Sequence, residues 1–368
     1  MSIAVPNSDQ IEVALFGPGY GECAAVHLGK SRWIIVDSCI DPSNGNPAVL
    51  NYLRTLGVNL NVDVRLIVVS HWHDDHVRGI SQIVEACSNA PICCSQTLTQ
   101  PEFIKAILNY KQLFSQSTST GLSEIENVFQ IAMKRKRFIW AAANKPLLNL
   151  KTDDDTPSCT VTALSPSDGE YELFLLEIAD LIPKELETKR RAPYLTPNHA
   201  SVALWIEVGS LSILLGSDLE EKGDASTGWS VIVQSKERPQ GRACIFKVPH
   251  HGSITGHNMD VWTKMIHEDR IAILSPYSLA DKILPKDSDI RRINKLAPES
   301  YITSKELSVK SKVSRPHVVQ KMINATVKKL RQACPNMGWI RLQNGGSTDP
   351  SNWHVFLSPQ ASRLADLI

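Results

Sequence analysis

The sequence predicts a mixed α/β fold, because short apolar runs typical of buried strands alternate with segments of helical spacing. The clearest run is Leu66–Val69, which is followed directly by the polar residues 70–76. Residues 47–56 and 80–87, on either side of this run and its loop, have the spacing of short helices. In open α/β sheets, loops that follow a buried strand are where ligands bind.

Residues 70–76 read Ser-His-Trp-His-Asp-Asp-His, with three histidines and two aspartates in seven positions. Imidazole nitrogens and carboxylate oxygens suit zinc, manganese or iron, and alternate residues of a tight loop can converge on one point. A solvated polar loop is the alternative interpretation. Four ligand-type side chains in the pattern His-x-His-x-Asp-His favour a metal site.

This pattern resembles the signature of the metallo-β-lactamase superfamily. The resemblance implies a four-layered αββα sandwich with two divalent metal ions, zinc or manganese, at one edge. It further implies that His71 and His73 hold the first metal. Asp75 and His76 would hold the second.

Two predicted strands precede the loop. Residues 11–16 end in Gly-Pro-Gly-Tyr-Gly (17–21), where glycine allows a tight turn. A hairpin is favoured over a phosphate-binding loop, because no helical pattern follows. Residues 33–36 end at Asp37, and the pair of strands resembles a superfamily branch in which this aspartate supports the metal loop. The alternative for Asp37 is a turn cap.

Composition is that of an ordinary globular protein: 368 residues, 42% hydrophobic and 21% charged, with a net charge of +1. The net charge therefore favours neither binding to nucleic acid nor binding to a membrane. The eight cysteines form no CxxC pair, so we expect reduced thiols. The first residues lack the pattern of a signal peptide, and no apolar run reaches membrane-spanning length. We expect a cytoplasmic protein without membrane contact.

More candidate ligands follow later in the chain. His199 lies in an Asn-x-x-Ser string before the predicted strand 202–206, and Asp218 follows the strand 211–215 in a Gly-x-Asp string. The resemblance implies that Asp218 bridges the two metals, which suits a carboxylate because each oxygen can face one cation. Many superfamily members have a histidine at this stage, so the resemblance also makes His199 a ligand of the first metal.

The strand 245–249 runs into His-His-Gly-Ser at 250–253, which gives the string Lys-Val-Pro-His-His-Gly-Ser. With the Asn-x-x-Ser and Gly-x-Asp strings, it resembles the metallo-β-lactamase domain of bacterial competence proteins that import DNA, and the free-standing relatives of that domain. The resemblance covers most of residues 11–285. In those relatives the domain is regarded as a metal-dependent phosphodiesterase and nuclease.

One departure from these relatives removes a ligand or an acid from the predicted site. They carry a His-Pro pair in the loop after the strand 272–275, whereas this chain has Ala-Asp-Lys-Ile-Leu-Pro at 280–285. We expect His250, His251 or His257 to complete the site. His250 is favoured as the ligand and His251 as a proton donor, with the exchanged assignment left open.

Two basic segments are candidates for contact with phosphates. Residues 100–150 are predicted to form a helical insertion near the site, and their Lys-Arg-Lys-Arg run at 134–137 either grips a phosphate backbone or is a solvated helix end. Twelve basic and four acidic side chains give residues 286–331 a local net charge of +8. One interpretation is that this basic segment forms a surface that contacts nucleic acid or a phosphorylated ligand. The alternatives are a solvated surface and an interface with an acidic protein.

We therefore predict a catalytic domain at 1–285 and a basic extension at 286–368 that completes or flanks the sandwich. The expected reaction is metal-assisted hydrolysis, in which two cations lower the pKa of a shared water to about 7. Asp75 would orient the hydroxide, Lys247 would neutralise a phosphoryl oxygen, and His251 would protonate the leaving group.

Nucleic acid or another phosphodiester is the expected substrate. One alternative is a hydrolase of small phosphodiesters, lactones or lactams, whose activity would hardly depend on salt. Another is a metal-bearing effector that remains silent until a protein partner activates it.

Overall fold

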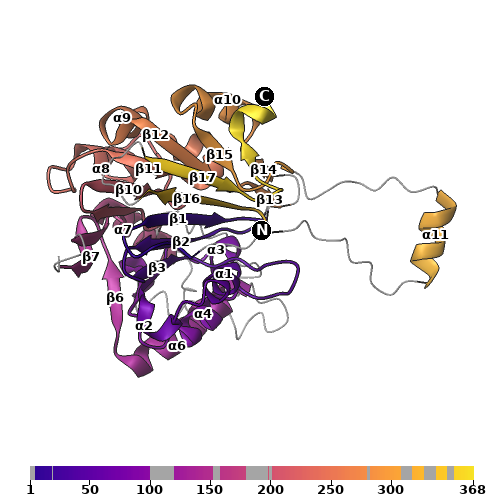
Figure 1. Cartoon of the computed structure of the whole chain (residues 1–368), viewed down its shortest axis with the longest axis horizontal. Helices are drawn as coiled ribbons and strands as arrows, with labels where there is room; N and C mark the ends of the chain where they lie inside the picture. Colours follow the sequence, from indigo (N-terminus) through magenta and orange to yellow (C-terminus); the bar gives the residue numbers. More distant parts are fainter. Residues whose placement is uncertain are drawn as a thin grey trace.

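Helices cover the outer faces of two large β-sheets that pack against each other, which gives four layers in the order helix, sheet, sheet, helix (Figure 1). The predicted αββα sandwich is confirmed. The computed structural model describes residues 5–18, 20–99, 120–151, 158–179, 198, 201–279, 282–307, 317–326, 337–345 and 352–368.

Each large sheet has eight strands, and each includes a parallel block. The first sheet runs in the order β17 (Trp353–Leu357), β16 (Trp339–Asn344), β1 (Ile11–Phe16), β2 (Cys23–Leu28), β3 (Trp33–Val36), β4 (Val64–Val69), β5 (Ile92–Ser95) and β6 (Phe138–Ala141). Its strands β3 to β6 are parallel neighbours.

The second sheet runs in the order β18 (Ser362–Arg363), β15 (Ser300–Ile302), β12 (Ile266–Leu274), β11 (Ala243–Lys247), β10 (Leu211–Leu215), β9 (Leu204–Val208), β8 (Cys159–Ala163) and β7 (Lys145–Leu150). Its strands β10, β11, β12 and β15 are parallel neighbours. Since the carboxyl ends of parallel strands meet at one edge, the loops after β10, β11 and β12 lie together. A separate hairpin, β13 (Tyr277–Leu279) and β14 (Lys282–Leu284), follows β12.

Most of the described helices form the two outer layers, whereas α11 (His317–Thr326) is drawn apart from the sandwich (Figure 1). Those beside the first sheet are α1 (Ala48–Thr55), α2 (Leu60–Asp63), α3 (Asp74–Val77), α4 (Ile80–Ala86) and α6 (Thr120–Arg135) (Figure 1). The remaining described helices are α7 (Asp168–Ala179), α8 (Gly228–Gln234), α9 (Met259–Lys264), α10 (Asp287–Leu296) and α11 (His317–Thr326). No helix among the described residues is long and apolar enough to cross a bilayer.

Three apolar cores lie between the layers. Successive side chains of a strand point to opposite faces of its sheet, so one strand contributes to two cores. In β1, Val13 and Leu15 point into the core between the sheets. Ala14 and Phe16 point into the core between the first sheet and its helices. All six residues of β1 are buried, so this strand lies in the interior of the sandwich.

The described part of the predicted insertion is built into these layers. Helix α6 packs beside α4 and buries Ile125, Val128 and Ala132 in the core between the first sheet and its helices. β6 is an edge strand of the first sheet, and β7 is an edge strand of the second. Residues 100–119 lie outside the described residues. The segment 120–150 is therefore part of the sandwich rather than a separate helical unit.

The basic run at 134–137 lies at the edge of the sheet opposite the metal loop. It precedes β6, which is parallel to β5 and β4, whereas the metal loop follows β4. Arg135 donates a hydrogen bond to the Val84 carbonyl (2.8 Å) and Arg137 to the Asn89 carbonyl (2.7 Å). Cations at the end of α4 are favourable there. The structure thus favours the helix-end interpretation over a phosphate grip at the site.

The C-terminal segment supplies strands to both sheets. β15 pairs with β12, and β16 lies between β1 and β17. A buried charge cluster links β1 to β16: the carboxylate of Glu12 accepts hydrogen bonds from Arg341 and Gln343, each 2.7 Å long. The Tyr52 hydroxyl, from α1, also bonds to Glu12.

Breaking this cluster should destabilise the whole sandwich. Arg341→Met leaves the Glu12 carboxylate buried and unpaired, so we expect the free energy of unfolding to fall by about 3–5 kcal/mol. In the double variant Glu12→Gln/Arg341→Met no charge is stranded, and most of that loss should be recovered. Urea denaturation of the three proteins measures both effects. A loss below about 1 kcal/mol in the single variant would contradict the assignment.

Candidate metal centre

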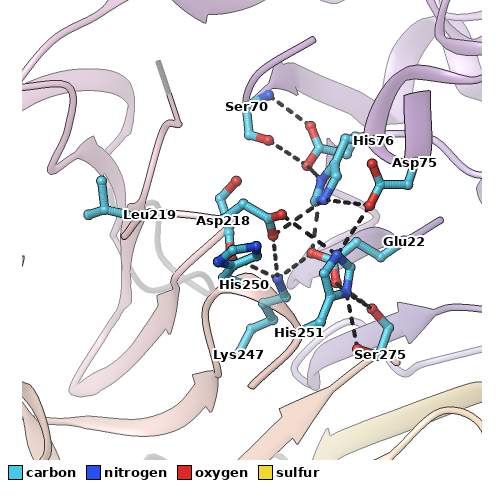
Figure 2. Close-up of polar contacts among 12 residues, drawn as sticks. Glu22, Ser70, Asp75, His76, Asp218, Leu219, Lys247, His250, His251 and Ser275 are labelled. Carbon is cyan, nitrogen blue, oxygen red and sulfur yellow. Dashed lines mark hydrogen bonds and ion pairs between the residues drawn. The ribbon is translucent and has the colours of Figure 1, made fainter. Parts of the chain in front are cut away.

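The candidate site lies where the loops of the two sheets meet. The metal loop follows the apolar strand β4, and its end forms the short helix α3, which starts at Asp74. From the second sheet, Asp218 follows β10 and His251 follows β11. Figure 2 shows Asp75 and His76 pointing toward Asp218 and His251 across this junction.

Asp37 anchors the metal loop, in the role expected for it. Its carboxylate accepts hydrogen bonds from the Ser70 amide and the Ser70 hydroxyl, both 2.7 Å long. The His76 Nδ1 lies 2.8 Å from the same carboxylate. The hydrogen bond orients the His76 ring and leaves its Nε2 facing the site.

Two groups of ligand-type atoms converge, each with all its atoms within 4.8 Å of one another. The first group contains His71, His73 and Asp218, and the second contains Asp75, His76, Asp218 and His251. In the first, His71 Nε2 lies 3.1 Å from His73 Nδ1 and 4.0 Å from Asp218 Oδ2. Asp218 belongs to both groups, which is the position the sequence predicts for a bridging carboxylate.

The second group is held together from both sheets. His76 Nε2 lies 3.3 Å from Asp218 Oδ1 and 3.7 Å from Asp75 Oδ2. His251 Nε2 lies 3.2 Å from Asp75 Oδ2 and 3.6 Å from Asp218 Oδ2. Asp75, Asp218 and both histidines are buried.

His251, rather than His250, joins this second group. Nδ1 of His250 instead faces the Glu220 carboxylate at 3.0 Å and the Thr255 hydroxyl at 2.7 Å. The physical reason is the backbone: both histidines have left-handed angles, with φ of 47° and 52°, so the chain turns sharply between them. Left-handed non-glycine residues are a form of strain that concentrates at functional sites.

Gly216 brings the two strand ends together. A Cβ at this position would lie 2.9 Å from the Lys247 carbonyl oxygen, which is too close for any other residue. The Gly216 amide donates to that carbonyl (3.0 Å), and the His250 amide donates to the Ser217 carbonyl (2.9 Å). The Gly-x-Asp string thus has a steric cause.

The other predicted site residues have different surroundings. His199 lies outside the described residues. Lys247 is buried, forms an ion pair with Glu22, and donates to the Ser217 carbonyl at 3.0 Å. His257 is half-buried, and burial with the charge of Arg292 lowers its pKa.

Glu22 is a site residue that sequence reasoning missed. Beyond its ion pair with Lys247, it lies 3.5 Å from His251 Nδ1 and 3.9 Å from His76 Nδ1. It also accepts a hydrogen bond from the Ser275 hydroxyl (Figure 2). The available signal was a carboxylate directly after the glycine-rich turn, beside the strand that ends at Asp37.

The residues present fit divalent cations. His76 Nε2 and Asp218 Oδ1 are buried and face each other without hydrogen-bond geometry, which is costly unless a further group satisfies them. Histidine nitrogens with carboxylate oxygens are the donor set of zinc and manganese sites. The candidate metal centre therefore has both the chemistry and the unsatisfied atoms that a metal would complete.

The two groups differ in their protonation. Burial and the neighbouring histidines lower the pKa of His71, and burial also lowers that of His73. For His76, burial is outweighed by the carboxylates of Asp218 and Asp75, which raise its pKa well above the usual value. The pKa of His251 is raised in the same way. The histidines of the first group are thus neutral at neutral pH, while those of the second group carry protons.

Cation binding to the second group should therefore release protons. At about pH 7, we expect calorimetric zinc titration of wild type to show a binding enthalpy that depends on the ionisation enthalpy of the buffer. His73→Ala, which damages the first group, should keep this dependence. His251→Ala, which damages the second, should lose most of it. An equal buffer dependence in the two variants would contradict this assignment.

Part of the chain is similar to a known protein family. Residues 16–142 match the family model of the metallo-beta-lactamase superfamily. No curated protein sequence matches the chain.

Three solved structures are similar to parts of this chain. The metallo-beta-lactamase fold protein YhfI from Bacillus subtilis is 16% identical over 65% of this chain and 70% of that chain, with a TM-score of 0.30. The hydrolase AbOPH, of the beta lactamase superfamily, is 16% identical over 59% and 75%, with a TM-score of 0.31. The Rm3 metallo-beta-lactamase is 12% identical over 72% and 83%, with a TM-score of 0.34.

The family match is the stronger finding, because it spans the part of the chain that builds half of the site. It contains the glycine-rich turn, Glu22, Asp37 and the whole metal loop. Residues 16–142 are therefore similar to the metallo-beta-lactamase superfamily in the part of the chain that carries the metal loop.

Proposed function

We propose that this chain is a metal-dependent hydrolase that cleaves phosphodiester bonds, with nucleic acid as its substrate class. The observation that supports it most is that Asp218 belongs to two neighbouring groups of histidine and carboxylate ligand atoms. A carboxylate shared in this way suits a pair of cations that act on one bond. The resemblance of the Lys-Val-Pro-His-His-Gly-Ser string to competence proteins supports the choice of a phosphodiester.

In this proposal, His71, His73 and Asp218 hold one cation, with His199 as a further ligand. The second cation is held by Asp75, His76, Asp218 and His251. Bound cations would polarise the phosphoryl group and lower the pKa of a water molecule. In the reaction the water oxygen bonds to phosphorus, the phosphorus–oxygen bond to the leaving alcohol breaks, and the leaving oxygen takes up a proton.

The hydrogen bonds of His251 favour a ligand over a proton donor. Its Nδ1 lies 3.1 Å from the Ser275 carbonyl oxygen, an acceptor that requires a proton on Nδ1. Nε2 can then offer its lone pair toward the metal centre. We therefore exchange the two histidine roles of the sequence analysis.

His250 is the proton donor in this assignment. Its Nδ1 is held by Glu220 and Thr255, and its Nε2 is then the ring nitrogen that can transfer a proton. The Glu220 carboxylate, whose pKa the nearby His250 lowers against the effect of burial, would stabilise the protonated ring.

In this proposal, Lys247 pairs with carboxylates of the protein and does not contact the substrate. Its ammonium group is paired with Glu22 and lies 3.9 Å from Asp218 Oδ1. It thereby offsets part of the negative charge that the site concentrates. Exposed cations at the rim, Arg78 and Lys282, are better placed to meet a phosphate.

Metal content tests the two groups separately. We expect about two metals per wild-type chain after reconstitution with zinc or manganese, and about one in His73→Ala or His251→Ala. Asp218→Ala should weaken both sites, because it removes the shared carboxylate. The matched control His257→Ala should keep about two metals. Full metal content in Asp218→Ala, measured by elemental analysis, would overturn the assignment.

Salt dependence tests the substrate class. Cleavage of single-stranded DNA below saturation should fall about tenfold or more between about 50 and 200 mM salt, because phosphate contacts release counterions. Cleavage of a small phosphodiester should change little over the same range. β-Lactam, lactone, RNA and duplex DNA substrates are assayed in parallel. Metal without turnover of any of them would favour a partner-activated effector.

A further inference from the structure

Beside the second metal group lies a cluster of two aromatic rings and two cations. The Tyr20 and Tyr277 ring centroids are 5.7 Å apart and the rings are tilted by 51°. The guanidinium carbon of Arg78 lies 5.0 Å from the Tyr20 ring centroid, and Lys282 Nζ lies 5.5 Å from that of Tyr277. We call these four residues the tyrosine cluster.

The tyrosine cluster is assembled from separate parts of the chain. Tyr20 belongs to the glycine-rich turn, Arg78 ends α3, and the hairpin β13–β14 supplies Tyr277 and Lys282. Both tyrosines are partly exposed, while Arg78 and Lys282 are exposed. Part of each tyrosine and both charges are therefore accessible to a bound molecule.

The cluster is continuous with the metal centre. The Tyr277 ring centroid lies 5.3 Å from that of His251, whose Nε2 faces Asp75 and Asp218. A group bound against Tyr277 would thus be separated from the reacting bond by one histidine ring. The metal centre, the aromatic rings and the cations thus lie next to one another, as do a phosphate, the base on the neighbouring sugar and the next phosphate in a nucleic-acid strand.

We propose that the tyrosine cluster is a subsite for an unpaired nucleotide next to the scissile phosphodiester. Its base contacts Tyr20 and Tyr277, and the adjacent phosphate meets Arg78 or Lys282. Aromatic side chains with flanking cations suit single-stranded nucleic acid, since every base offers a π-face and every linkage a negative charge. The bases of a duplex are stacked on each other, so the subsite selects single strands. This inference rests on the proposed phosphodiesterase function and names its substrate.

Two substrates with the same leaving group isolate the subsite. Thymidine p-nitrophenyl phosphate carries a base, and methyl p-nitrophenyl phosphate does not. We expect Tyr20→Leu and Tyr277→Leu to lower the ratio of kcat/KM for the first ester over the second about tenfold. Tyr20→Phe and Tyr277→Phe keep the ring and should keep the ratio. Leu279→Ala, an exposed side chain on the same hairpin, should also keep it.

The ratio separates recognition from a structural role. A leucine variant that damages only the fold or the metal centre lowers both kcat/KM values equally, and an unchanged ratio would overturn the proposal. If wild type hydrolyses neither ester, the proposed phosphodiesterase function is wrong. The nucleotide subsite is then tested by a binding measurement. Fluorescence anisotropy of a labelled single-stranded oligonucleotide with zinc-loaded protein should then show about tenfold weaker binding in the leucine variants. Equal binding in wild type and variants would overturn the subsite as well.

Discussion

The hydrogen bonds of Asp37 fix the loop on which the rest of the site depends. One carboxylate binds Ser70 at the start of the loop and His76 near its end, so the intervening histidines project from a segment held at both sides. Asp37 itself has a left-handed backbone, with φ of 62°, which aspartate tolerates better than most residues. The second sheet then needs to contribute only Asp218 and His251 to close the second group.

Charge is the second constraint on this site. Glu22, Asp37, Asp75 and Asp218 are all buried in one region, and buried carboxylates are unfavourable unless they are paired. Lys247 and protonated histidines offset this charge when no cation is bound. Bound cations would replace the protons, so the same carboxylates that raise the pKa of His76 also create the affinity for metal.

Much of the fold and half of the site could be predicted because the signals are local. Short apolar strands that end in polar residues identify the metal loop, Asp37 and Asp218 without any knowledge of distant contacts. The choice between His250 and His251 depends on two successive left-handed residues. Sequence patterns give the residue types of such a turn but not the direction in which each ring points.

Other features depend on contacts between distant segments. Glu22 was missed because the glycine-rich turn before it already has a sufficient structural explanation, and its partner Lys247 comes from the other sheet. The edge occupied by the basic run 134–137 depends on the direction of β6, which only pairing with β5 reveals. The tyrosine cluster likewise joins three segments that have no shared motif.

The position of β16 has a consequence for the synthesis of this protein. β1 leaves the ribosome long before its neighbour β16, so one of its edges remains unpaired until residues 339–344 emerge and the Arg341 side chain reaches Glu12. Between the synthesis of these two strands, the growing chain therefore exposes an apolar strand edge, which is a template for wrong pairing. A chaperone that shields β1 during this interval would act on the step at which the chain is most prone to aggregate.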